Sequence, residues 1–289
     1  TIIACMFFAA ISGSGPATVA AIGTFMIPAM IAKKYDAGFA AAVPAAAGSI
    51  GVIIPPSIPF VIYGVIGNVS VGDMFIAGII PGLLIGISLI MTAYIISKRR
   101  GYKPEDETEK FSIKDVLVAL NDAKWALLIP VIILGGIYGG IFTPTEAAVV
   151  AVVYAIIIGV FVYKELDLKG LYDSFMETII INATTMIIIG LSVSFAYFMT
   201  IEQIPNQIAQ FLTDLSSNPI VILILINLLL IVVGMFIDTI SAIVILTPIL
   251  LPVVMAVGVD PVHFGVILVA NLAIGFVTPP LGVNLFVAS

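Results

Sequence analysis

The chain has 289 residues, of which 61% are hydrophobic and 10% are charged, and its formal net charge is −6. Soluble domains are about 45–50% apolar and about 25% charged, so this composition excludes a water-soluble globular protein. A single cysteine excludes a disulfide framework or a cysteine-rich metal site within this chain. Because apolar runs of about 20 residues recur along the sequence, we expect a multi-pass helical membrane protein and not an outer-membrane barrel.

The apolar segments predict, in chain order, a hairpin, five spanning helices and a second hairpin followed by a broken helix. The hairpins cover residues 1–32 and 220–256, and each has a polar centre within an apolar stretch. The spans are expected at 37–66, 74–97, 125–141, 147–163 and 178–200. Lys33 and Lys34 are assigned to the cytoplasm because short cytoplasmic loops collect basic residues. The chain starts without Met and stops inside an apolar run, so we expect a piece of a longer protein.

The chain aligns with itself at an offset of 224 residues, which places Gly51 on Gly275 and Ser14 on Asp238. Each repeat is predicted to be a re-entrant hairpin followed by a helix broken at Gly-x-x-x-Pro-Pro, since proline removes a backbone donor and clashes with the preceding turn. The charge pattern directs the first broken helix outward and the second inward, which makes the repeats inverted. Inverted repeats with interrupted helices are typical of secondary transporters.

Other functional classes have weaker support. A channel or a structural bundle with kinked helices is an alternative, but kinks alone do not explain paired hairpin centres in register with paired breaks. For an enzyme, Gly13-Ser14-Gly15 lacks the spacing of a nucleophile elbow, and the one histidine, His263, lies in a predicted outer loop. Nucleic-acid binding is not expected, because the basic stretch at 97–124 also carries many acidic residues.

The repeat predicts two candidate cation sites. At a hairpin tip, the last carbonyls of one half-helix and the first amides of the next meet, and the broken helix opposite adds the carbonyl oxygens that hard cations bind. Close carbonyl approach and unusual dihedrals would both favour glycine at the breaks. The residues expected at the first site are Ser12, Gly13, Ser14, Gly51 and Ile54. Those expected at the second site are Asp238, Thr239, Gly275 and Thr278.

Three further side-chain interpretations follow. Asp238 lies deep in an apolar hairpin, where a carboxylate is costly and favours an ion-binding role, although an Asp there can also cap the second half-helix. Glu146 is interpreted as structural, because Thr143-Pro144-Thr145-Glu146 has the spacing of a capping box. Ser57 and Asn284, which lie just beyond the breaks, are the candidates for substrate binding.

Four motifs in the same order resemble the large membrane subunit of tripartite ATP-independent periplasmic (TRAP) transporters, the DctM family. They are the stretches Ser12–Gly23, Gly51–Ser57, Gly140–Ala148 and Gly275–Asn284. The resemblance implies an elevator-type symporter of the bacterial inner membrane that imports C4-dicarboxylates, sialic acid or similar organic acids with sodium ions bound near the hairpin tips. It also implies two partners, a periplasmic binding protein and a small four-helix membrane subunit. The resemblance also leads us to expect that the family's first helices and C-terminal end lie outside this chain.

The expected domain organisation combines the repeats with this resemblance. Residues 1–97 and 220–289 are the two repeats of the transport domain, and residues 125–219 are scaffold helices. Residues 98–124 are a cytoplasmic amphipathic connector, because apolar and charged residues alternate there at helical spacing. The remaining alternatives are a stand-alone sodium-coupled anion carrier of the same superfamily and, less favoured, a channel.

Overall fold

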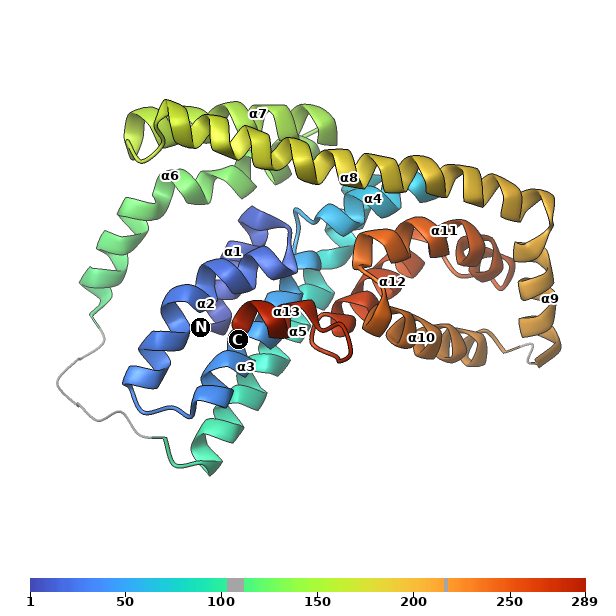
Figure 1. Ribbon diagram of the computed structural model, residues 1–289, viewed down its shortest axis with the longest axis horizontal. Helices are drawn as coiled ribbons and strands as arrows, with labels where there is room; N and C mark the ends of the chain where they lie inside the picture. The colour runs from blue at the N-terminus through green and yellow to red at the C-terminus, as the bar shows by residue number, and fades with distance from the viewer. Residues whose placement is uncertain (103–111, 216–217) are drawn as a thin grey trace. The chain divides into compact units, whose positions relative to one another are not determined.

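The computed structural model describes residues 1–102, 112–215 and 218–289, and every regular element in these ranges is a helix (Figure 1). The elements up to residue 99 are α1 (Ile2–Ser12), α2 (Gly15–Ala32), α3 (Ala37–Gly48), the 3-10 helix η1 (Ser49–Val52), α4 (Ile58–Gly67) and α5 (Val71–Arg99). The later elements are α6 (Ile113–Tyr138), α7 (Pro144–Ile157), the π-helix η2 (Ile158–Val162), α8 (Leu168–Ile201), α9 (Ile204–Leu215), α10 (Pro219–Phe236), α11 (Thr239–Ala256), α12 (Pro261–Gly275) and α13 (Val283–Ala288).

Seven of the described helices are long and apolar enough to cross a membrane: α2, α5, α6, α7 with η2, α8, α10 and α11. The shortest of them has 18 residues, which at about 1.5 Å per residue approaches the thickness of a hydrocarbon core of about 30 Å. Helices α5 to α8 cover the four later spans expected from the sequence. The prediction of an all-helical, multi-pass membrane protein is therefore confirmed.

The helices recur at the offset found in the sequence. Helix α11 begins and ends 224 residues after α2, and both are preceded by a two-residue tip, Gly13–Ser14 or Ile237–Asp238. The broken segments correspond as well, since each contains a cis peptide bond, in Pro55–Pro56 and in Pro279–Pro280. Each repeat thus consists of two helices joined at a short tip, followed by a helix that is interrupted at a Pro-Pro pair.

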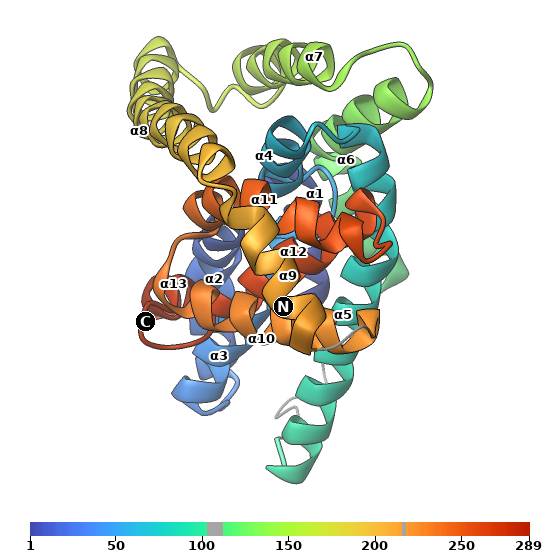
Figure 2. The same cartoon turned by 90° about the vertical axis from the view of Figure 1, so that its right-hand side faces the viewer.

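Packing divides the chain into two compact units, residues 1–95 with 184–289 and residues 96–183. Unit 1, the first of these, contains both repeats. Within it α2 packs on α3, and α12 packs on α10 and α11. The second half of each broken helix packs on the other repeat: α4 lies against α11 and α12, and α13 lies against α2 and α3 (Figures 1 and 2). The two repeats therefore interlock by exchanging equivalent half-helices.

Two hydrogen bonds join the exchanged half-helices to their new neighbours. In α4, the hydroxyl of Tyr63 donates to the carbonyl of Pro261 at 2.6 Å. In α13, the side-chain amide of Asn284 donates to the carbonyl of Ala45 at 3.0 Å. Tyr63 is fully buried and meets Phe264 edge-on, with ring centroids 6.4 Å apart. These bonds fix both half-helices across the boundary between the repeats.

Unit 2, residues 96–183, contains the end of α5, all of α6, α7 and η2, and the start of α8. Helix α6 packs on α7, and two tyrosine hydroxyls tie the pair together. Tyr154 donates to the carbonyl of Trp125 at 3.1 Å, and Tyr163 donates to the carbonyl of Asp122 at 2.8 Å. Residues 103–111, which belong to the expected connector 98–124, lie outside the described residues.

The start of α7 has the capping box expected from the sequence. The backbone N–H of Thr143 donates to the carboxylate of Glu146 at 2.8 Å, and the N–H of Glu146 donates to the Thr143 hydroxyl at 3.3 Å. These reciprocal bonds satisfy two amides that a helix start leaves without intrahelical partners. The structural interpretation of Glu146 is confirmed.

Candidate functional site

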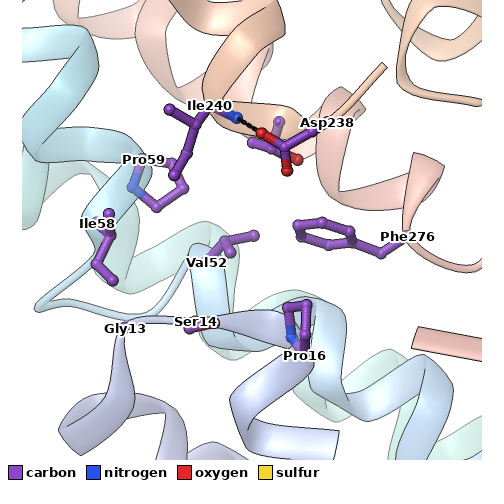
Figure 3. Close-up of a pocket in the computed structure, with 10 residues that line it drawn as sticks. Gly13, Ser14, Pro16, Val52, Ile58, Pro59, Asp238, Ile240 and Phe276 are labelled. Carbon is purple, nitrogen blue, oxygen red and sulfur yellow. Dashed lines mark hydrogen bonds between the residues drawn. The ribbon is translucent and has the colours of Figure 1, made fainter. Parts of the chain in front are cut away.

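The two hairpin tips line a single cavity of about 110 Å³ in unit 1 (Figure 3). The cavity is lined by Gly13, Ser14, Pro16, Val52, Ile58, Pro59, Asp238, Thr239, Ile240 and Phe276. Figure 3 shows Asp238 and Ile240 on one side and Ser14 and Pro16 on the opposite side, with the ring of Phe276 directed into the space between them. The fold thus brings together tip residues that are more than 200 positions apart in the sequence.

Many of the lining residues occupy equivalent positions in the two repeats. Three pairs that face the cavity are separated by the repeat offset: Ser14 with Asp238, Pro16 with Ile240, and Val52 with Phe276. The cavity therefore lies where the two repeats meet. Among the described residues that line it, none is Lys or Arg, and the polar side chains come from the tips and from Thr239, the first residue of α11.

The first tip packs closely on the first break. Gly13 ends α1 with a φ of 62°, a left-handed conformation that glycine adopts without steric cost. A Cβ atom on Gly13 would lie 2.8 Å from the carbonyl oxygen of Pro56, and the Gly13 carbonyl accepts a hydrogen bond from the N–H of Ile58 at 3.2 Å. Ser14 follows as the N-cap of α2. This tip is thereby fixed against the broken helix.

Three oxygens form a cluster behind the first tip. The Thr18 hydroxyl donates to the Ser14 carbonyl at 2.7 Å and lies 3.0 Å from the Ser12 hydroxyl, which is 3.3 Å from the same carbonyl. Hard cations such as Ca²⁺ hold oxygens at about 2.3–2.6 Å, so one point outside the plane of these three atoms can lie within bonding distance of all of them. The cluster can offer one face of an oxygen shell to a cation, with Thr18 fully buried.

Gly51 of the first break lies against this oxygen cluster. A Cβ atom there would be 2.6 Å from the Ser14 carbonyl oxygen and 2.7 Å from the Thr18 hydroxyl, so only glycine fits without displacing the tip. Ile54 is half-buried, and its N–H donates to the carbonyl of Ile50 at 3.0 Å. Of the residues predicted for the first site, Gly13 and Ser14 line the cavity, and Ser12 and Gly51 lie close to Ser14 without lining it. Ile54 does not line the cavity.

The second tip is more exposed and carries a charge. Asp238 accepts hydrogen bonds through Oδ2 from the N–H groups of Ile240 and Ser241, at 3.0 and 3.3 Å. The capping interpretation of Asp238 is therefore confirmed. Asp238 is exposed, and within the described part of the chain its other oxygen, Oδ1, has no hydrogen-bond partner. Thr239 also lines the cavity and is buried.

The second break contacts a different partner from the first. Gly275 lies against Gly234 in α10, and a Cβ atom on Gly275 would overlap the Gly234 backbone. The Thr278 hydroxyl donates to the Ile274 carbonyl at 2.7 Å, and neither Gly275 nor Thr278 lines the cavity. Gly51 and Gly275 both lack a positive φ, so the expectation of unusual dihedrals there is wrong; the need for glycine is steric.

The two substrate candidates are buried and do not line the cavity in this conformation. The Ser57 hydroxyl donates to the Val52 carbonyl at 2.6 Å and accepts from the N–H of Phe60 at 3.3 Å as the N-cap of α4. The Asn284 amide group donates to Ala45, and its buried Oδ1 has no hydrogen-bond partner among the described residues. Both side chains hold the ends of the breaks in place.

The whole chain, residues 1–289, matches the family described as "Tripartite ATP-independent periplasmic transporter, DctM component". The chain belongs to the DctM family. DctM is a family of membrane transporter permeases, so the chain is not an enzyme. The resemblance inferred from four motifs is confirmed, and it extends over the full chain.

Named relatives of this DctM chain differ in their cargo. It is 56% identical over 289 residues to the isethionate TRAP transporter permease protein DctMQ of Oleidesulfovibrio alaskensis. It is 43% identical over 288 residues to the C4-dicarboxylate TRAP transporter large permease protein DctM of Pseudomonas aeruginosa, and 44% identical over 289 residues to the sialic acid TRAP transporter large permease protein SiaM of Vibrio cholerae. Each match covers all of this chain, but only 45% of the first relative and 67% of the other two.

Two residues at the DctM site were missed by the sequence analysis. Thr18 lies four residues after Ser14, a spacing at which a threonine hydroxyl on a helix reaches back to a carbonyl. Phe276 follows Gly275 and falls on Val52 at the repeat offset. Helical spacing from the cap identifies Thr18 and the repeat alignment identifies Phe276, whereas polar tips and break glycines point to neither residue.

Proposed function

We propose that the full-length protein is the large membrane subunit of a TRAP transporter in a bacterial inner membrane. It acts as a secondary active symporter that imports a small organic acid together with sodium ions. A periplasmic binding protein delivers the cargo, and a small four-helix membrane subunit is the partner within the bilayer. Isethionate, C4-dicarboxylates and sialic acid, the cargoes named for the relatives, are the candidate substrates.

The observation that carries this proposal is the cavity lined by equivalent residues of both repeats. Secondary transporters bind substrate and coupling ions near the interface between their repeats. Helices α2 and α11 both begin beside the cavity, and the N-terminal end of a helix carries roughly half a positive charge. An anionic cargo in this cavity would still be repelled by Asp238, so a bound cation is needed to offset that charge.

The two tips supply oxygen atoms suited to sodium. At the first tip the ligands are the oxygens of Ser12 and Thr18 with the carbonyl of Ser14, while Gly51 allows the close approach. At the second tip the free Oδ1 of Asp238 is the ligand. In this proposal the remaining predicted residues complete the sites when the breaks and tips move: Gly13, Ile54, Thr239, Gly275 and Thr278. Ser57 and Asn284 stay the proposed cargo contacts at the breaks.

The proposed transport cycle is an elevator motion. Residues 1–97 and 220–289 form the transport domain, residues 125–219 form the scaffold, and residues 98–124 connect them on the cytoplasmic side. Two observations support the grouping of the repeats: both belong to one compact unit, which also includes residues 184–219 of the proposed scaffold, and their half-helices interlock, so they can move as one body. Inverted repeats place equivalent positions on opposite sides of the membrane.

Cysteine labelling tests the inverted arrangement. Positions 33 and 257 are equivalent at the repeat offset, and both lie at the C-terminal ends of α2 and α11. In a background without other cysteines, an impermeant reagent applied from outside should label Val257→Cys and leave Lys33→Cys unmodified. Labelling of both positions from the same side would disprove the inversion.

Uptake into liposomes tests the transport function. The full-length protein and its small subunit are reconstituted, and uptake of radiolabelled isethionate or succinate is measured with and without a sodium gradient and binding protein. Saturable uptake that requires both is expected. Sodium-driven uptake without the binding protein would indicate a stand-alone carrier, and non-saturable uptake without sodium would indicate a channel.

A further inference from the structure

We propose that Phe276 and Val52 form a size filter that limits the cargo to compact organic anions and excludes large sugar acids such as sialic acid. The proposal rests on the proposed function, because it takes the cavity between the tips as the place where the cargo binds. It assigns a role to the residue that directly follows each break glycine, Val52 after Gly51 and Phe276 after Gly275, which the ion sites do not use.

The dimensions of the cavity are the first support. Its volume is about 110 Å³. By comparison, an engineered apolar cavity of about 150 Å³ accommodates one benzene molecule, and a water molecule occupies about 30 Å³ in the liquid. Because the present cavity is smaller than that one, a small sulfonate such as isethionate or a short dicarboxylate such as succinate would need a limited displacement of the walls. Sialic acid is a much larger molecule and would need a greater displacement.

The position of Phe276 is the second support. Its ring is directed into the cavity between Ser14 and Asp238, and only 7% of the residue is exposed (Figure 3). A Cβ atom on Gly15 would lie 3.1 Å from Cε2 of the ring, so the first residue of α2 backs the ring closely. The ring is thereby prevented from withdrawing toward α2, and it acts as a fixed wall.

The repeat alignment shows that this wall is asymmetric. Val52 occupies the position of Phe276 in the first repeat, and Thr239 occupies the position of Gly15 in the second. The large ring of Phe276 therefore lies against the small Gly15. At the equivalent positions the sizes are reversed, because Thr239 is larger than Gly15 and Val52 is smaller than Phe276, and both line the cavity. Exchanging the residue at 276 or 52 changes the free width of the cavity without touching the oxygens proposed to bind sodium.

Direct binding to the membrane subunit tests the filter, because it avoids the selectivity of the binding protein. The full-length permease with its small subunit is purified in detergent with saturating sodium, and the Kd values of isethionate, succinate and sialic acid are measured by calorimetry. The unmodified protein should bind the two small anions at least about tenfold more tightly than sialic acid, within the range of about 10–200-fold that a pocket achieves for one methylene.

Two variants change the free width of the cavity in opposite directions. Phe276→Ala should reduce the preference for small anions at least about tenfold, since it removes the wall. Val52→Leu should weaken succinate binding more than isethionate binding, because it narrows the cavity. The matched control is Phe286→Ala in α13, where the side chain is 71% exposed and lies outside the cavity lining; it should leave all three ratios unchanged.

The outcomes separate the filter from the proposed function. Equal affinity for all three anions in the unmodified protein, or unchanged ratios in Val52→Leu and in a folded Phe276→Ala, would overturn the filter alone. If Phe276→Ala does not fold, Val52→Leu decides the question by itself. Sodium-dependent binding of none of the three anions would overturn both the proposed function and the filter.

Discussion

The two hairpin tips follow the same backbone path but differ in chemistry. The first tip is held against its break by the Ile58–Gly13 hydrogen bond and by a neutral oxygen cluster that includes the buried Thr18. At the second tip, Ile237 is 39% exposed and Asp238 brings a carboxylate, while the residue equivalent to Thr18 is Ala242. The first tip is therefore packed and neutral, and the second is exposed and charged.

The repeat therefore preserves the positions of the helices but not the residues that make up the two candidate ion sites. Gly51 contacts the oxygen cluster of its own tip, whereas Gly275 contacts Gly234, which lies four residues before Asp238. In our proposal the neutral oxygens of the first ion site thus already lie close together. The second site depends on the charged Asp238, and the glycine of its break packs on α10 and not on the tip. Variants at equivalent positions should have unequal effects.

The largest effects are expected from adding a methyl group at the two break glycines. Gly51→Ala places a Cβ atom 2.6 Å from the Ser14 carbonyl oxygen, and Gly275→Ala drives one into the backbone of Gly234. Overpacking typically costs about 1–3 kcal/mol, so uptake should fall about tenfold or more in both variants. Gly275→Ala should also lower the melting temperature, because it separates α10 from α12.

The matched control is Gly190→Ala in α8, where an added Cβ meets no atom within 4 Å. This variant should transport normally and be at least as stable as the parent protein, because alanine favours a helix interior over glycine. Uptake and melting temperature are measured on the full-length protein in liposomes and in detergent. Near-normal uptake by both break variants would remove the breaks from the mechanism and favour a channel or a structural bundle.

The next largest effect is expected at the charged tip. Asp238→Asn keeps the cap, since Asn and Asp are equally good N-caps, but removes the negative charge. We expect the sodium concentration for half-maximal uptake to rise about tenfold, as for loss of a charged ligand. The control is Glu146→Gln, which alters another carboxylate at a helix start and preserves the capping-box pattern. An unchanged sodium half-saturation and cooperativity in Asp238→Asn would refute its assignment as a ligand.

A smaller effect is expected at the neutral tip. Thr18→Val keeps the shape of the side chain and removes the hydroxyl that bonds to Ser14, so the sodium half-saturation should rise about two- to tenfold. Thr18→Ser should restore the parent value. Thr24→Val is the matched control, because the Thr24 hydroxyl lies on the same helix and bonds only to the carbonyl of Ala20. Equal behaviour of Thr18→Val and Thr24→Val would argue against a role of Thr18 in ion binding.

Sequence patterns predicted the parts of this molecule that local rules and repetition determine. The offset predicted the equivalent helices and breaks, and the capping box at Thr143 and Glu146 followed from spacing alone. The contact between Gly275 and Gly234 depends on how α10 and α12 cross, which no local pattern reports. The cavity wall at Phe276 was missed for a similar reason, since an aromatic residue in an apolar helix carries no signal until its neighbours are known.

The smallest effect is expected at the bonds that lock the exchanged half-helices. Tyr63→Phe removes the 2.6 Å hydrogen bond from α4 to Pro261 and leaves the ring in place. Pro261 is the first residue of α12, so its carbonyl can still accept the hydrogen bond from within that helix. The variant therefore leaves no buried carbonyl without a hydrogen-bond partner. The free energy of unfolding should therefore fall by only about 0.5–1.5 kcal/mol, with normal sodium dependence.

Denaturation of the purified full-length protein in detergent measures this change, with Tyr94→Phe, at a 65% exposed tyrosine in α5, as the control. The comparison concerns how the two repeats are joined. If packing of α4 on α11 and α12 holds the repeats together, loss of one hydrogen bond leaves transport intact. If Tyr63→Phe instead abolishes uptake while Tyr94→Phe does not, the hydrogen bond itself couples the repeats, and the half-helix that carries Asn284 should be equally sensitive to loss of its bond to Ala45.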